Sequence, residues 1–242
     1  MKKFIVGNWK MNPQNLAEAK KIFYFVKRKL KKMPQIFKKI EVIICPPFVF
    51  IPLLKAKNSK IKLGAQNVFW KEKGAFTGEI SLLMLKDLKV EYVILGHSER
   101  RRYFGETNET INRKLKIVLR EGLRAILCIG ETKEERDSKK TFKVLKKQIE
   151  RALFGIKNFK NLILAYEPIW AIGTGNPCKP EQAKEVLGFI KKKLKNIPVL
   201  YGGSINLKVA KDYINVGFDG LLIGGASLRP KEFVEICKTC AA

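Results

Sequence analysis

Short apolar runs alternate with longer amphipathic segments along the chain. The runs are rich in β-branched residues and apolar over most of their length, which is typical of strands buried on both faces of a parallel sheet. Eight of them are predicted as strands, at residues 4–7, 41–45, 61–65, 92–95, 124–129, 162–166, 199–201 and 220–223.

The segments between these runs have the apolar spacing of helices. In the first of them, Leu16, Ile22, Phe23 and Val26 recur at helical intervals, so a helix is predicted there and after each other strand. Eight strand–helix units in 242 residues fit a closed (β/α)8 barrel of about 250 residues better than an open doubly wound sheet, which has fewer strands. The predicted fold is therefore an α/β barrel of eight parallel strands. Because no linker or composition shift divides the chain, residues 1–242 are expected to form a single domain.

Polar side chains follow several of the predicted strands. In a closed barrel these positions converge on one rim, the face on which active sites are built. The residues concerned are Asn8, Lys10, His97, Glu99, Glu131, Glu167 and the turn 202–204. The sequence therefore predicts a functional site at the carboxyl ends of the strands.

Two of these residues are candidates for acid–base chemistry. His97 begins a short helix-like stretch after a strand, where the helix dipole disfavours the imidazolium, so a neutral imidazole that donates to a substrate carbonyl is predicted. Glu167 precedes an apolar, Trp-containing loop that could close over its carboxylate, which is typical of a general base. A structural histidine and a solvated glutamate beside a packed loop are the respective alternatives.

Two glycine-rich turns follow the last two predicted strands, at residues 202–204 and 224–227. Glycine lets backbone N–H groups approach an anion closely, and the loops after the last two strands of such barrels often bind phosphate. Phosphate binding is therefore predicted, and because neither turn has the Walker pattern a nucleoside triphosphate is not indicated.

The composition changes this interpretation in one respect. With 46% hydrophobic and 29% charged residues, the chain has the material for a core and is not disordered. Its 49 Lys and Arg against 22 Asp and Glu give a formal net charge of +27, which suggests nucleic acid as a partner. The basic residues lie mostly on predicted helices, however, and an Arg-rich patch interleaved with aromatics is lacking, so only non-specific adhesion to polyanions is expected.

Membrane and metal partners are also not expected. No apolar run approaches the ~20 residues of a membrane span, and the run after Lys2 and Lys3 is too short for a signal peptide, so the expected compartment is the cytoplasm. The five cysteines are scattered, which indicates reduced thiols, and Cys237 and Cys240 have no second pair. Since His97 is the only histidine, no zinc site is predicted.

Eight motifs together resemble the triosephosphate isomerases, in the right order from the first strand to the last. They are Asn-Trp-Lys-Met-Asn at 8–12, Gly-Ala-Gln-Asn at 64–67, Gly-Ala-Phe-Thr-Gly-Glu at 74–79, Gly-His-Ser-Glu-Arg-Arg at 96–101, Cys-Ile-Gly-Glu-Thr at 128–132, Ala-Tyr-Glu-Pro and its loop at 165–175, Tyr-Gly-Gly-Ser at 201–204 and Gly-Gly-Ala-Ser-Leu at 224–228. The resemblance implies a TIM barrel that interconverts dihydroxyacetone phosphate and D-glyceraldehyde 3-phosphate through an enediolate, in glycolysis and gluconeogenesis, without cofactor or metal.

The resemblance also implies roles for individual residues. Glu167 would be the base and His97 the neutral acid. Lys10 would supply positive charge to the oxyanion and the phosphate, Asn8 a neutral donor, and Glu99 support for Lys10. Substrate binding would involve Asn8, Lys10, Gly173, Ser204, Gly224 and Gly225, the lid would consist of Pro168, Ile169, Trp170, Ala171, Ile172, Gly173 and Thr174, and Cys128 would pack near the base rather than react.

A homodimer follows from the same resemblance, with a higher oligomer as a possibility. Phe76 and Thr77, on a long loop after the third strand, would insert beside the Lys10 loop of a neighbouring subunit. One departure concerns the end of the lid, which reads Asn176-Pro177-Cys178 where the family usually has Lys, a small or β-branched residue and Ala. Because Pro177 fixes one φ angle, the opening kinetics of the lid are in question. The alternatives are another phosphosugar barrel enzyme and a catalytically silent, polyanion-binding barrel.

Overall fold

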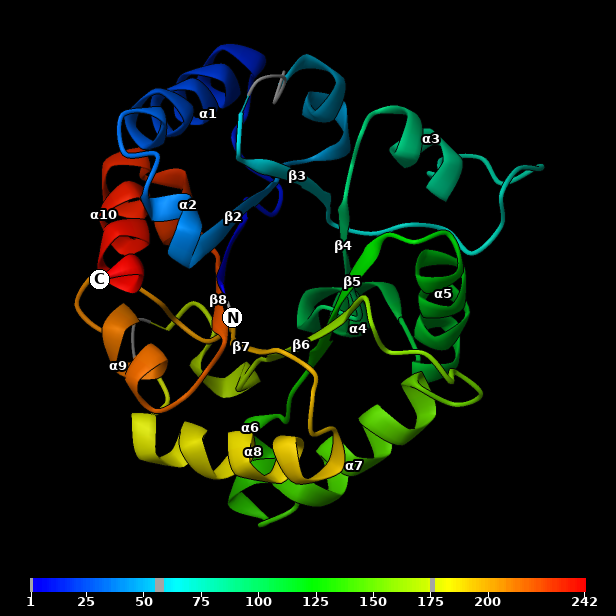
Figure 1. The fold of residues 1–242 in the computed structure, drawn as a ribbon. Helices are drawn as coiled ribbons and strands as arrows, with labels where there is room; N and C mark the ends of the chain where they lie inside the picture. Colours follow the sequence, from blue (N-terminus) through cyan, green and yellow to red (C-terminus); the bar gives the residue numbers. More distant parts are fainter. Residues whose placement is uncertain (1, 55–58, 175–176) are drawn as a thin grey trace.

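A closed barrel of eight parallel strands forms the centre of the computed structural model, which describes residues 2–54, 59–174 and 177–242. The strands follow one another around the barrel in chain order, and β1 pairs with both β2 and β8 to close it (Figure 1). They are β1 (Lys3–Asn8), β2 (Ile40–Cys45), β3 (Lys62–Ala65), β4 (Tyr92–Leu95), β5 (Arg124–Ile129), β6 (Leu162–Tyr166), β7 (Val199–Tyr201) and β8 (Gly220–Ile223). The predicted fold class is confirmed, and the last five strands have the predicted bounds.

Helices surround the barrel (Figure 1). The α-helices are α1 (Leu16–Lys31), α2 (Ile36–Lys39), α3 (Leu82–Asp87), α4 (Ser98–Phe104), α5 (Asn108–Arg120), α6 (Lys133–Asp137), α7 (Thr141–Ala152), α8 (Pro180–Lys193), α9 (Ala210–Asn215) and α10 (Pro230–Ala241). In the described part of the chain, three 3-10 helices lie in loops after β2, β6 and β8: η1 (Phe48–Leu53), η2 (Ile169–Ala171) and η3 (Gly225–Leu228). Among the described helices, none has both the length and the apolar character that a membrane span requires.

The prediction of an α-helix after every strand is wrong for β2. In the described part of that connection the chain forms only the 3-10 helix η1, which begins after Pro47 and contains Pro52. Proline has no N–H to donate and its ring clashes with the preceding turn of an α-helix. The shorter helical form is the local structure that this sequence permits.

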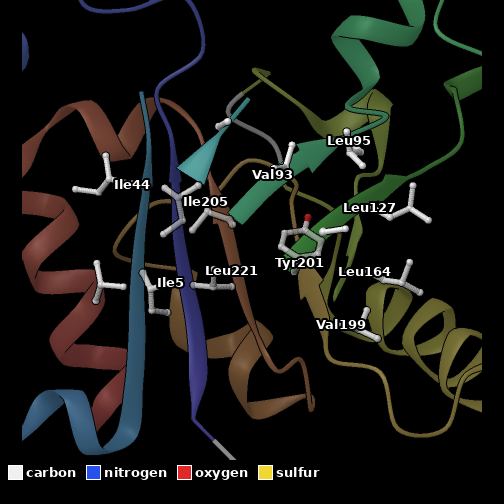
Figure 2. Close-up of a cluster of buried hydrophobic side chains, with 14 of the residues drawn as sticks. Ile5, Ile44, Val93, Leu95, Leu127, Leu164, Val199, Tyr201, Ile205 and Leu221 are labelled. Atoms are coloured by element: carbon white, nitrogen blue, oxygen red, sulfur yellow. The ribbon is translucent and has the colours of Figure 1, made fainter. Parts of the chain in front are cut away.

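The core has two layers, because successive residues of a strand point to opposite faces. Inside the barrel lie the side chains of one set, such as Val6, Ile94 and Ile126. The other set packs outward against the helices, and Figure 2 shows Ile5, Ile44, Val93, Leu95, Leu127, Leu164, Val199 and Leu221 in that layer. Both faces of the strands are therefore buried, as their apolar runs predicted.

A polar cluster lies at the amino ends of the strands, at the opposite end of the barrel from the predicted site. The Tyr92 hydroxyl is hydrogen-bonded to the Glu41 carboxylate and accepts from Arg124 Nη1 at 2.7 Å. Active sites in such barrels lie at the carboxyl ends of the strands. A cluster at the amino ends is therefore expected to contribute to stability rather than to catalysis.

Candidate active site at the carboxyl ends of the strands

A cavity of about 240 Å³ lies at the carboxyl ends of the strands. Its wall brings together residues from loops after β1, β4, β6, β7 and β8. Among them are Asn8, Lys10, His97, Glu167, Gly173, Ser204, Gly224 and Gly225. A larger hollow of about 770 Å³ lies between α5 and α7 on the outer surface, but it contains none of the predicted site residues. The predicted site residues in these loops therefore lie together at the predicted rim of the barrel.

Glu167 lies at the centre of this arrangement. It directly follows β6, and its side chain is only 2% exposed. Carboxylate atom Oε2 accepts the backbone N–H of Ser98 at 3.0 Å, and Oε1 lies 3.1 Å from Nε2 of His97. Space for the residue comes from two glycines: a Cβ at Gly130 would lie 1.7 Å from the Glu167 carbonyl oxygen, and one at Gly202 would lie 3.0 Å from Glu167 Cγ.

His97 is the residue immediately before α4 and caps that helix. Its Nδ1 accepts the backbone N–H of Glu99 at 3.2 Å, so the ring proton is on Nε2. Nε2 points to Glu167 Oε1 at 3.1 Å and borders the cavity. Nε2 is therefore the donor end of the ring, and it lies at the cavity.

Lys10 has a backbone conformation that non-glycine residues rarely adopt, with φ of 54°. Three contacts fix it: its N–H donates to Asn8 Oδ1 at 3.0 Å, its carbonyl accepts from Gln66 Nε2 at 2.9 Å, and its Nζ lies 2.5 Å from Glu99 Oε1. A Cβ at Gly224 would approach Lys10 Cε to 3.3 Å. The ammonium group is therefore held at the cavity by its own backbone and by Glu99.

Gln66 is a residue to which the sequence analysis gave no role. Its Nε2 also donates to the Cys45 carbonyl at 2.9 Å, so one side chain joins the ends of β2 and β3 to the Lys10 loop. The available signal was its place directly after β3, since polar residues after the other strands were singled out as candidates. A single sequence does not show which backbone such an amide reaches.

The glycine-rich turns supply backbone donors. Among the described residues, the N–H groups of Gly173, Ser204 and Gly225 have no acceptor, and all three residues line the cavity. Gly225 is the first residue of η3, where a free N–H is expected at a helix start. The Ser204 hydroxyl, by contrast, donates to the Ala171 carbonyl of the predicted lid at 2.6 Å.

The predicted lid, residues 168–174, is held by a buried carboxylate. Glu131 is completely buried, and its Oε1 accepts from Trp170 Nε1 at 3.0 Å and from the Tyr166 hydroxyl and Arg136 Nη1 at 3.1 Å each. The Arg136 guanidinium also lies 4.7 Å from the Trp170 ring. Glu131 was noted in the sequence only as a polar residue after a strand. Gly175, the last residue of the loop motif, and Asn176, in the predicted hinge, lie outside the described residues.

Cys128 lies inside the barrel beneath Glu167. Burial first, and the nearby Glu167 carboxylate second, raise the pKa of its thiol well above the ordinary value. A thiol that stays protonated is a poor nucleophile. This agrees with the expectation that Cys128 packs rather than reacts.

Phe76 and Thr77 do not contribute to the cavity of their own chain. They lie on the exposed segment 71–79, which projects from the barrel before α3 (Figure 1). The Phe76 ring contacts Phe69, at 4.7 Å between ring centroids, and remains 40% exposed. Among the described residues, no group of three or more His, Cys, Asp or Glu side chains is arranged to hold a metal ion.

Comparison with known proteins decides the family. The family model described as triosephosphate isomerase matches residues 3–240. A triosephosphate isomerase of Dehalococcoides mccartyi is 47% identical over 98% of this chain and 96% of its own length. The chain belongs to the triosephosphate isomerase family. Triosephosphate isomerases of Trichodesmium erythraeum (47% identical, 97% of this chain and 98% of the relative) and Dictyoglomus thermophilum (44%, 98% and 99%) are similarly close.

Membership of the triosephosphate isomerase family establishes the reaction. The protein is a glycolytic isomerase that interconverts dihydroxyacetone phosphate and D-glyceraldehyde 3-phosphate, and its substrate is a triose phosphate. The alternative of a different phosphosugar barrel enzyme is therefore wrong. The cavity at the carboxyl ends of the strands is the candidate site for this chemistry, because the Glu167 carboxylate lies 3.1 Å from the His97 imidazole and the Lys10 ammonium group lines the same cavity.

Proposed function

We propose that Glu167 is the base of the isomerisation and that His97, Lys10, Asn8 and Glu99 stabilise and direct its proton transfers. The contact between Glu167 Oε1 and His97 Nε2, at 3.1 Å in the wall of one cavity, supports this proposal most strongly. The Glu167 carboxylate can accept a proton from a substrate carbon, and the His97 imidazole beside it can donate a proton to a substrate oxygen.

The first step is abstraction of a proton from C1 of dihydroxyacetone phosphate. Glu167 exchanges its hydrogen bond with the Ser98 N–H for contact with this C–H bond and takes the proton. The two electrons of that bond form the C1–C2 double bond, and the carbonyl electrons move to oxygen to give the enediolate. After proton exchange between the two oxygens, the same carboxyl group returns a proton to C2. No electrons enter or leave the substrate, so the reaction requires no redox cofactor.

The developing oxyanion is stabilised by donors that are already oriented. His97 offers Nε2–H, because Nδ1 is occupied as an acceptor. Lys10 adds a positive charge, held by Glu99 at 2.5 Å. Asn8 uses Oδ1 to accept the Lys10 N–H, so its NH₂ group is the end available to substrate oxygen. Donors fixed in advance need no reorganisation as charge develops, which is a large source of catalytic rate.

The phosphate dianion is held by backbone N–H groups. Gly173, Ser204 and Gly225 provide them, Gly224 allows the backbone to approach closely, and Lys10 contributes long-range attraction. Residues 168–174 close over the substrate as a lid. The loop of triosephosphate isomerase is itself a standard example of such a lid, which keeps water from the reacting atoms.

We further propose one domain for residues 1–242 and a homodimer as the active form. Pairing of β1 with β8 and packing of α10 against α1 support the single domain. For the dimer, the exposed ring of Phe76 and the neighbouring Thr77 are the proposed insertion into a second copy, because an exposed apolar anchor on a projecting loop is typical of a contact surface.

Replacing the proposed base tests the catalytic assignment. Glu167→Gln is expected to lower kcat by several orders of magnitude with little change in KM, because proton abstraction is lost while the phosphate contacts remain. The matched control is Glu41→Gln, which removes a carboxylate at the opposite end of the same barrel. Both are assayed by a coupled dihydroxyacetone phosphate assay containing a chelator. A Glu167→Gln enzyme with a tenth of the parent kcat would overturn the assignment.

A further inference from the structure

The lid is followed by a backbone position that is held from both sides. The N–H of Cys178 donates to the Tyr201 hydroxyl at 3.1 Å, and the carbonyl of Cys178 accepts from the Tyr213 hydroxyl at 2.5 Å. The N–H belongs to the peptide unit before the α-carbon and the carbonyl to the unit after it. Two hydrogen bonds therefore restrict both φ and ψ of Cys178, which one bond alone does not do.

The two tyrosines are themselves fixed. Their rings stack with centroids 3.6 Å apart and planes 9° from parallel, and both side chains are completely buried. Phe218 packs edge-on against the Tyr201 ring at 5.6 Å. Tyr201 ends β7 and Tyr213 lies in α9, so Cys178 is attached to two separate elements of the barrel.

The position of Tyr201 connects this contact to the phosphate turn. A Cβ at Gly203 would lie 2.2 Å from the Tyr201 hydroxyl, so the hydroxyl fills the space beneath the turn that carries Ser204. Ser204 in turn donates to the Ala171 carbonyl of the lid. The lid is thus fixed at Ala171 through Ser204 and followed by a fixed residue at Cys178, and both attachments lead to the end of β7.

Packing alone does not account for the Tyr213 hydroxyl. A phenylalanine ring would make the same stack, whereas a buried hydroxyl is unfavourable unless it is hydrogen-bonded. Burial, as the main cause, raises the pKa of Tyr213 to about 12, so the hydroxyl keeps its proton at neutral pH. Its acceptor among the described residues is the Cys178 carbonyl.

We propose that the hydroxyl of Tyr213 is a positioning group that fixes the C-terminal end of the lid through the Cys178 carbonyl and so sets how completely the lid closes over the enediolate. The inference rests on the lid assigned above to residues 168–174. It adds a residue of α9, outside the cavity, to the groups on which turnover depends.

Tyr213→Phe tests this, because it keeps the stacked ring and removes only the hydroxyl. Loss of one hydrogen bond from the closed state is expected to lower kcat about fivefold. An incompletely closed lid also admits water to the enediolate, whose bond from carbon to the phosphate oxygen then breaks. The phosphate leaves with the bonding electrons, and the enol that remains becomes methylglyoxal. The share of methylglyoxal and inorganic phosphate among the products is expected to rise about fivefold.

The matched control is Tyr92→Phe, which removes a buried, hydrogen-bonded tyrosine hydroxyl at the other end of the barrel. Both variants should lose thermal stability, but the product ratio should change in Tyr213→Phe alone. If Tyr213→Phe loses stability while kcat and the product ratio stay at parent values, the hydroxyl is structural and the proposal is wrong. The failure of the catalytic assignment is a separate result, an active Glu167→Gln enzyme, so the two proposals are distinguishable.

Discussion

The conformation of Lys10 depends on a side chain that follows another strand, and this dependence can be tested at Gln66. The φ of 54° at Lys10 is a left-handed conformation, which costs a non-glycine residue about 1–2 kcal/mol. The hydrogen bond from Gln66 Nε2 to the Lys10 carbonyl, at 2.9 Å, contributes about 1 kcal/mol. The two quantities are of similar size, so Gln66 offsets much of the strain.

Gln66→Met keeps the length of the side chain and removes its donor. With the hydrogen bond lost, the left-handed conformation competes with ordinary backbone conformations in which Lys10 Nζ no longer faces the cavity. A loss of about 1 kcal/mol corresponds to about a fivefold change in rate, so kcat/KM is expected to fall about fivefold. The Cys45 carbonyl loses the same donor, and a second loss of about 1 kcal/mol should appear as reduced stability.

Steady-state kinetics and thermal unfolding of the same preparation check this expectation. Gln35→Met, at an exposed position after α1, is the control for introducing methionine. The reasoning predicts a fall in kcat/KM that persists well below the unfolding temperature. A Gln66→Met enzyme with a lowered Tm and parent kcat/KM would show that Asn8 and Glu99 suffice to hold Lys10, and would refute the argument.

Three other outcomes follow from the structure. Deleting residues 169–174 should raise the methylglyoxal share among products, measured by product analysis, because the enediolate is then exposed to water; an unchanged ratio would remove the protective role of the lid. Phe76→Asp with Thr77→Glu should give a folded monomer with kcat at least ~100-fold lower, since ~3 kcal/mol of lost preorganisation is enough; sedimentation velocity and turnover on one sample decide it, and a fully active monomer would contradict it. Glu106 is buried, which opposes its ionisation, but hydrogen bonds and charges of Arg100 and Lys114 outweigh burial and lower its pKa. A lowered carboxyl pKa stabilises the fold above the unfolded-state value and ceases to do so as pH falls through the folded-state value. The difference in unfolding free energy between the parent and Glu106→Gln, about 3 kcal/mol at neutral pH, should therefore shrink below about pH 4.5; a difference independent of pH would refute it.

The fold could be predicted because its strands carry a local signal. The run 162–166 is apolar at each position up to Tyr166, and a strand buried on both faces needs no partner to be recognised. The connection after β2 was mispredicted because Pro52 overrides the expectation of a helix. The correct prediction at 162–166 and the wrong one after β2 both concern local signals, which a single sequence contains.

For the candidate site too, features that depend on position along the chain were predicted, and contacts between distant residues were not. Glu167, His97 and Lys10 follow strand ends, and barrel closure alone brings such residues to one rim. Their roles came from the motifs, whereas the contacts that orient them did not. Gln66 reaches a carbonyl 56 residues away, and Trp170 reaches a carboxylate 39 residues away. Contacts between residues so far apart leave no periodic pattern in the sequence, so only the three-dimensional structure reveals these contacts.

Three residues whose roles were not predicted share a physical character. Gln66, Glu131 and Tyr213 each use a side chain to satisfy or restrain groups on a loop that carries functional residues. A loop on the rim of a barrel has no ladder of backbone hydrogen bonds of its own, so its backbone groups need partners from the scaffold. We therefore expect catalytic precision in this protein to depend on side chains one contact behind the cavity. Substitutions there should reduce turnover without removing any group that touches the substrate.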